Sequence, residues 1–162
     1  MTTLVLKTSK FTIVVILIAI IAISLALLWR ITQDATISKY ETFIDMTSYT
    51  IKLDVSKGYR IEKTDDPEVA NAFAIYKNDN MIVDYGFITS GNNKLLAQAT
   101  ISENLYDKAY SITNAVVYVV YNQEVNSFYM FVDYAAKTEY AYLSGTATQE
   151  EIKDLIYAMD VK

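Results

Sequence analysis

The feature that most constrains this chain is an uninterrupted apolar run, FTIVVILIAIIAISLALLW, which extends from Phe11 to Trp29. It contains no charged side chain, and Lys10 and Arg30 stand at its two ends. At 1.5 Å per residue, such a run makes about 28 Å of helix, close to the roughly 30 Å hydrocarbon core of a bilayer. We therefore predict a short cytoplasmic leader at residues 1–10 and a transmembrane helix at 11–30, with Phe11, Trp29 and Arg30 as membrane anchor residues.

The flanks of the run predict how the anchor is retained and oriented. A secretory signal has a shorter apolar core followed by a cleavage site of small residues, and here the only such pair, Ser24 and Ala26, lies inside the run. Lys7 and Lys10 precede the run and favour a cytoplasmic N-terminus. The expected location is the cell membrane, with a single-pass signal anchor and the C-terminal domain outside. The expected partners are the lipid bilayer and either other membrane or envelope proteins or a second copy of the chain.

The absence of two residue types limits the chemistry. The chain has no histidine and no cysteine, which excludes Ser-His-Asp and Cys-His catalysis, histidine-based metal sites and disulfides. Its net charge of −5 argues against binding nucleic acid through phosphates. We predict no enzyme activity, no cofactor, no metal site and no nucleic-acid partner. A histidine-free hydrolase that uses paired carboxylates or a Ser-Lys dyad stays open as an alternative.

The middle of the chain mixes helical and strand patterns. Ile37, Tyr40, Phe43 and Ile44 have helical spacing, which predicts a helical stalk at 31–46 before an extracytoplasmic α+β domain at 47–162. Alternation predicts one hairpin in SYTIKLDV and GYRIEKT and a second in FAIYK and MIVDYGFIT. Pro67 predicts a short helix, and the stretch after Ser90 predicts a helix in two pieces around Ser102.

The last third carries the clearest patterns. AVVYVVY, SFYMFVDY and TEYAYLSG predict three strands. Thr148 and Glu151 have capping-box spacing, and an apolar stripe follows at i, i+3, i+4 and i+7, which predicts a terminal helix laid against a sheet. The predicted fold class is α+β: one N-terminal transmembrane helix, then a single antiparallel-sheet α/β sandwich domain with a C-terminal helix.

The join between the last strand and the last helix resembles known domains. Across residues 138–160, the pattern formed by Tyr142, Gly145, Thr148, Glu151 and Ile152 resembles that of small PsbP-like α/β sandwich domains and of extracytoplasmic domains of Gram-positive membrane-anchored proteins. This resemblance implies an antiparallel sheet with helices on its faces and a role that is usually non-enzymatic. No functional residue can be assigned to this chain from this resemblance.

The apolar run has a second resemblance. KFTIVVILIAIIA is similar to the start of type IV pilins and pseudopilins, in which a phenylalanine opens a hydrophobic helix at the processing site. The chain departs from that pattern at two positions, with Lys10 where the family has glycine and Val15 where it has glutamate. The resemblance implies an alternative function as a pilin-like filament subunit.

Tyrosines supply the candidate binding residues. The chain has 14 tyrosines, all of them after the apolar run, and they are dense in the last strands. Tyrosine is enriched both on sheet surfaces and at protein interfaces, so either role is open. A candidate partner-binding face comprises Tyr118, Tyr129, Phe131, Tyr140 and Tyr142. We expect a membrane-anchored binding or assembly module, acting as an accessory subunit of a bacterial membrane or cell-surface complex.

Overall fold

The computed structural model describes residues 10–35, 37–44, 46–66 and 69–162. The chain divides into two compact units, residues 1–36 and 37–162, which are described separately. The first contains helix α1, Lys10–Ala35. The side chains described in α1, from Val14 to Leu28, are exposed.

No helix among the described residues combines the length and the apolarity needed to cross a membrane. This finding contradicts the predicted transmembrane helix, the single-pass signal anchor and the cell-membrane location, and we do not retain them. Phe11, Trp29 and Arg30 belong to α1, but their side chains lie outside the described part.

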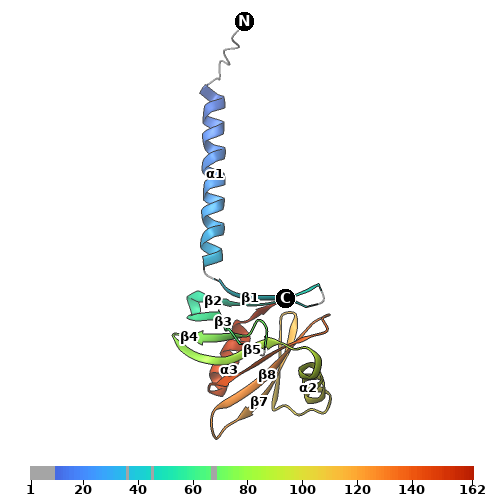
Figure 1. Ribbon diagram of the computed structural model, residues 1–162. Helices are drawn as coiled ribbons and strands as arrows, with labels where there is room; N and C mark the ends of the chain where they lie inside the picture. The colour runs from blue at the N-terminus through green and yellow to red at the C-terminus, as the bar shows by residue number, and fades with distance from the viewer. Residues whose placement is uncertain (1–9, 36, 45, 67–68) are drawn as a thin grey trace. The chain divides into compact units, whose positions relative to one another are not determined.

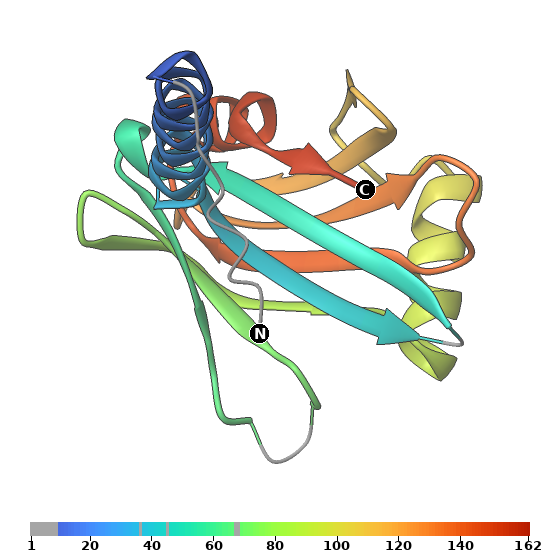
Figure 2. The same cartoon turned by 90° about the horizontal axis from the view of Figure 1, so that it is seen from above.

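The second unit is built mainly from two antiparallel sheets (Figures 1 and 2). The smaller sheet has the order β1-β2-β10, with β1 at Ile37–Ile44, β2 at Thr47–Asp54 and β10 at Asp160–Val161. The larger sheet has seven strands in the order β3-β4-β5-β9-β8-β7-β6. Their bounds are β3 Tyr59–Lys63, β4 Phe73–Lys77, β5 Asn80–Ile88, β6 Lys108–Ile112, β7 Ala115–Asn122, β8 Ser127–Tyr134 and β9 Tyr140–Thr146. Figure 2 shows β1 and β2 crossing over the strands of the larger sheet.

The predicted fold class is therefore wrong in its sheet architecture as well as in its anchor. We predicted a helical stalk at 31–46, but helix α1 ends at Ala35 and strand β1 begins at Ile37. In β1 the more buried positions alternate through Ser38, Tyr40 and Thr42. Two of these three inward side chains are polar, so the apolar residues of this segment do not alternate as they would in a typical strand. Together with β2 and β10, this strand forms a second sheet in place of the predicted single one.

The first predicted hairpin is also wrong in its pairing. Both strands exist and are joined by a short 3-10 turn, Val55–Lys57, that ends at Gly58 with φ of 82°. However, β2 pairs with β1 and β10, whereas β3 pairs with β4 in the other sheet. A Cβ at Gly58 would lie 2.0 Å from Oδ1 of Asn78, so glycine serves both the backbone conformation and the close approach of the β4–β5 turn. The connection therefore carries the chain between sheets.

Two helices complete the second unit. Helix α2 is Gly91–Ser102, and the predicted second helical piece after Ser102 is replaced by a loop and β6. Helix α3 is Gln149–Ala158, and the predicted capping box is confirmed: Glu151 N donates to Oγ1 of Thr148, and Thr148 N donates to a carboxylate oxygen of Glu151. Pro67, where we predicted a short helix, lies outside the described residues; the second predicted hairpin is confirmed as β4 and β5.

The main core lies between the two sheets and α3. Alternate residues of the larger sheet, including Val117, Met130 and Leu143, are buried against it. From the other side come Ile51 and Leu53 of the smaller sheet and the apolar stripe of α3, Ile152, Leu155 and Ile156. We call the side of the larger sheet that faces this core the core face. Its opposite side carries the candidate site.

Candidate functional site: the aromatic face of the larger sheet

The opposite side of the larger sheet, here called the aromatic face, contains a row of rings that runs across four strands. Strand register places Tyr118 of β7 opposite Phe131 of β8, Phe131 opposite Tyr142 of β9, and Tyr142 opposite Phe87 of β5. Since side chains on paired positions share a face, all four rings lie on the same side of the sheet. Four of the five predicted face residues belong to this row or the next, and the structure brings them together.

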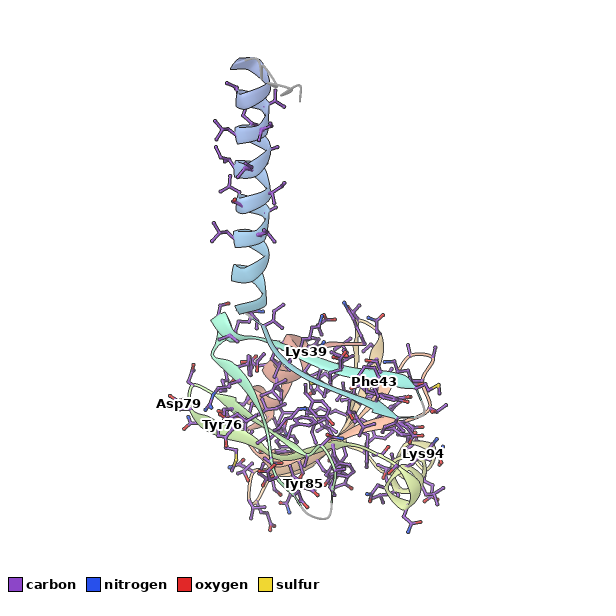
Figure 3. The ribbon with its side chains drawn as sticks, turned by 45° about the horizontal axis from the view of Figure 1, so that its top comes forward. Lys39, Phe43, Tyr76, Asp79, Tyr85 and Lys94 are labelled. Carbon is purple, nitrogen blue, oxygen red and sulfur yellow. The ribbon has the colours of Figure 1, made fainter. Side chains whose placement is uncertain are left out.

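A second row lies beside the first and extends the aromatic surface. It runs from Val120 through Tyr129 and Ser144 to Tyr85. Figure 3 shows Tyr85 on the far side of the domain from Lys39 of the smaller sheet. The fifth predicted residue, Tyr140, lies on the other flank of the ring row, where it is opposite Asp133. All five predicted face residues therefore occupy one continuous surface.

The rings of this surface contact one another. Ring centroids are 5.5 Å apart for Phe131 and Tyr142, 5.2 Å for Phe87 and Tyr142, and 5.9 Å for Tyr129 and Phe131. Phe131 and Phe87 are buried, whereas the tyrosines are only partly buried. The phenylalanines thus form a floor, and the tyrosines present ring surface and hydroxyls to solvent, the arrangement that suits a contact surface.

Helix α2 covers one end of this face and leaves a hollow beside it. Ala97 and Thr100 of α2 are buried. The hollow has a volume of about 320 Å³. It is lined by Val69, Tyr85, Phe87, Thr89, Asn93, Leu96, Phe131 and Tyr142. None of these side chains is charged, so the hollow offers apolar and aromatic surface with a few neutral hydrogen-bonding groups, a composition that is common in binding pockets.

The hydroxyls of Tyr118, Tyr129 and Tyr140 stay protonated well above neutral pH. Burial, followed by the nearby charge of Asp133, raises the pKa of Tyr118, and the same two causes raise the pKa of Tyr140 against the opposing effect of Lys94. Burial first, then its neighbour Tyr142, raises the pKa of Tyr129. At neutral pH these groups are therefore hydrogen-bond donors and acceptors and not anions.

Asp133 is the site residue that the sequence did not reveal. It lies on β8 between Val116 and Tyr140 in the register, on the same side as Tyr129 and Phe131. It is partly buried, and burial raises the pKa of its carboxyl group. A signal was present, because Asp133 follows Tyr129 and Phe131 at the odd-numbered positions of the strand.

Phe87, Tyr85 and Tyr106 also join the face without having been predicted. Tyr106 comes from the loop after α2, and its ring centroid is 4.9 Å from that of Tyr118. Phe87 and Tyr85 come from β5, which is distant in sequence from β8 and β9. Their alternation was visible in the sequence, but the pairing of β5 with β9 depends on long-range topology that a single sequence does not specify.

No group of three or more acidic side chains that could hold a metal ion occurs among the described residues. The predictions that the chain has no metal, no cofactor and no enzyme activity stay predictions. No family model, curated protein or solved structure matches the chain. The resemblances to PsbP-like domains and to pilins therefore also stay predictions, and the geometry of the aromatic face is the basis for a functional proposal.

Proposed function

We propose that this protein is a binding module that contacts a protein partner through the aromatic face of its larger sheet. The observation that carries the proposal is the row Tyr118, Phe131, Tyr142 and Phe87, whose rings cross four strands while α2 covers only one end of the face. The other side of the same sheet is covered by the smaller sheet and α3.

The chemistry of the row suits a protein partner. Tyrosine is enriched at protein interfaces because its rigid ring supplies apolar contact area while its hydroxyl stays compatible with water before binding. Buried Phe131 and Phe87 hold the partly exposed rings of Tyr129 and Tyr142 in fixed positions, so little side-chain entropy is lost on association. The hollow of about 320 Å³ beside α2 is large enough to receive an apolar side chain of the partner.

Site-specific photo-crosslinking tests this proposal. The full chain would carry a photoreactive phenylalanine analogue at Tyr129 and be irradiated in the cells that make it. The matched control carries the same group at Tyr157, an exposed tyrosine of α3 away from the face. We expect a discrete crosslinked protein from position 129 that is absent from position 157 and is lost when Phe131→Asp is combined with it. Equal adducts from both positions, or none from position 129, would contradict the proposal.

The first unit favours a second candidate function, that of a filament subunit. The exposed apolar side chains described in α1 include Val15, Ile18, Leu25 and Leu28, so the helix carries apolar side chains on every side between Val14 and Leu28. A helix that is apolar all round is normally buried against other structure, and helices of further copies would supply it. N-terminal sequencing distinguishes the two candidates, because a mature chain beginning at Phe11 supports the filament subunit and an assembled chain that retains Met1 excludes it.

A further inference from the structure

Asp133 is an acidic side chain set within the strand rows of the aromatic face. Its paired neighbours are Val116 and Tyr140, and the next positions along those strands are Tyr118 and Tyr142. A carboxylate on a sheet face, with aromatic and aliphatic neighbours on both adjacent strands, has lost part of its hydration without gaining a strand-to-strand ion pair.

The carboxylate has no partner within the described part of the chain. The raised pKa of Asp133 is due to burial alone, with no hydrogen bond or neighbouring cation to oppose it. Lys94 of α2, whose charge acts on Tyr140, donates to the carboxylate of Glu139 over 2.8 Å. Leaving a partly buried carboxylate unpaired costs free energy. A ligand that brings a cation to this carboxylate removes the cost, which strengthens the binding of the ligand.

Aromatic rings flank the carboxylate. Asp133 is directly opposite Tyr140 of β9 in the register, and Tyr118 is diagonal to it on β7, so the three groups lie close together on one face. Tyr106 packs edge-on against Tyr118, with the planes at 65°. Aromatic ring faces attract cations, and a carboxylate between two such rings forms a receptor that a guanidinium or ammonium group can fill. The net charge of −5 adds a long-range attraction for basic ligands.

We infer that Asp133, flanked by Tyr118 and Tyr140, receives an arginine or lysine side chain of the protein partner. This inference rests on the proposed function. The partner would place a basic side chain at Asp133 and, next to it, residues that pack on the row formed by Tyr118, Phe131, Tyr142 and Phe87. Arginine is the better fit of the two, because its planar guanidinium can stack on a tyrosine ring and hydrogen-bond a carboxylate at the same time.

The test uses a minimal probe that carries only the basic group. The full chain, labelled with ¹³C in its tyrosine rings, would be titrated with N-acetyl-arginine-N-methylamide and, separately, with the citrulline analogue, which has nearly the same shape and no charge. We expect the arginine probe to shift the ring signals of Tyr118 and Tyr140 and the citrulline probe to leave them in place. Asp133→Asn should raise the half-saturating concentration of the arginine probe by about threefold to tenfold.

Asp84→Asn is the matched control, because Asp84 is an exposed carboxylate next to the same face and contacts Ser144. It should leave the titration unchanged. Equal shifts with citrulline, or an Asp133→Asn titration like that of the unsubstituted protein, would overturn the inference. Those results would leave the crosslink from Tyr129 intact, so a failed charge receptor is distinguishable from a failed binding face.

Discussion

The two sides of the larger sheet are made by alternate residues of the same strands, yet they differ in chemistry and in covering. The core face is mostly aliphatic, with Val117, Met130 and Leu143 fully buried under the smaller sheet and α3. The aromatic face carries tyrosines, two phenylalanines and the carboxylate of Asp133 among its described residues, and α2 covers it at one end. The fold therefore covers one side of the sheet by itself, and the other side carries groups that tolerate water and suit the proposed partner contact.

The sharpest test of the comparison is a pair of truncations at adjacent positions of β8. Met130→Ala removes a fully buried side chain of the core face and should lower the free energy of unfolding by about 2–5 kcal/mol. Tyr129→Ala removes a partly exposed ring from the aromatic face and should cost about 1 kcal/mol. Urea unfolding of both variants measures the two values. Equal losses would show that the aromatic face is also part of the folding core.

A second test adds volume to the core face. A Cβ at Gly145 of β9 would lie 2.1 Å from the carbonyl oxygen of Ile82, which is backbone and cannot move aside. Gly145→Ala should therefore cost about 1–3 kcal/mol in thermal or urea unfolding. Gly86→Ala is the control, since the added methyl group would meet the ring of Phe73 at 2.6 Å, and a side chain yields more readily than backbone. A smaller loss at Gly145 than at Gly86 would contradict this account.

Alkaline pH should separate the tyrosines of the core from those of the aromatic face. Burial raises the pKa of Tyr40 from 10.0 to about 12, while its hydroxyl donates to the carbonyl of Asn71 over 2.8 Å. In the unfolded chain the group ionises near pH 10, so the stability it contributes is complete below pH 10 and is lost as pH rises toward 12, at about 1.4 kcal/mol per pH unit.

Unfolding free energies measured from pH 9 to pH 12 give that slope. Tyr40→Phe should flatten it, and Tyr129→Phe on the aromatic face should change it much less because that hydroxyl is partly exposed. A slope that responds equally to both substitutions would contradict the difference in burial.

The smallest expected effect concerns Tyr134, on the core face of β8. Its hydroxyl is buried and has no hydrogen-bond partner within the described residues, while Nζ of Lys137 lies 5.1 Å from its ring centroid. Tyr134→Phe removes the unsatisfied hydroxyl and keeps the ring, so stability at pH 7 should rise by about 1 kcal/mol. Thermal unfolding measures the change. A loss of stability would reveal a buried water or another partner for the hydroxyl.

Local patterns in the sequence predicted much of the second unit, because many of its strands alternate clearly and α3 has a capping box. Those patterns failed where pairing is long-range or where polar residues point inward. The inward polar residues Ser38 and Thr42 hid the strand period of β1, and no local signal indicates that β2 pairs with β10 from the far end of the described chain. The two-sheet architecture depends on these two strands, so it could not be predicted.

The candidate site was predicted in part for the same reason. Tyr129 and Phe131 were placed on one side of their strand by alternation alone, and the register confirms that Tyr142 and Tyr118 lie beside Phe131. Asp133 was overlooked because one acid in a strand usually faces solvent and has no role. Its significance depends on the two tyrosines beside it and on the lack of a cation, which are facts of tertiary structure.

The position of β10 also bears on how the chain folds as it is synthesised. Lys52 and Ile51 of β2 pair with Asp160 and Val161, and Thr50 exchanges backbone hydrogen bonds with Lys162. A ribosome releases β1 and β2 early and these last residues much later, so one edge of the hairpin stays unpaired while all seven strands of the larger sheet emerge. An unpaired edge can join strands of other chains. Correct folding of the nascent chain therefore depends on how long the edge of β2 stays unpaired before β10 is synthesised.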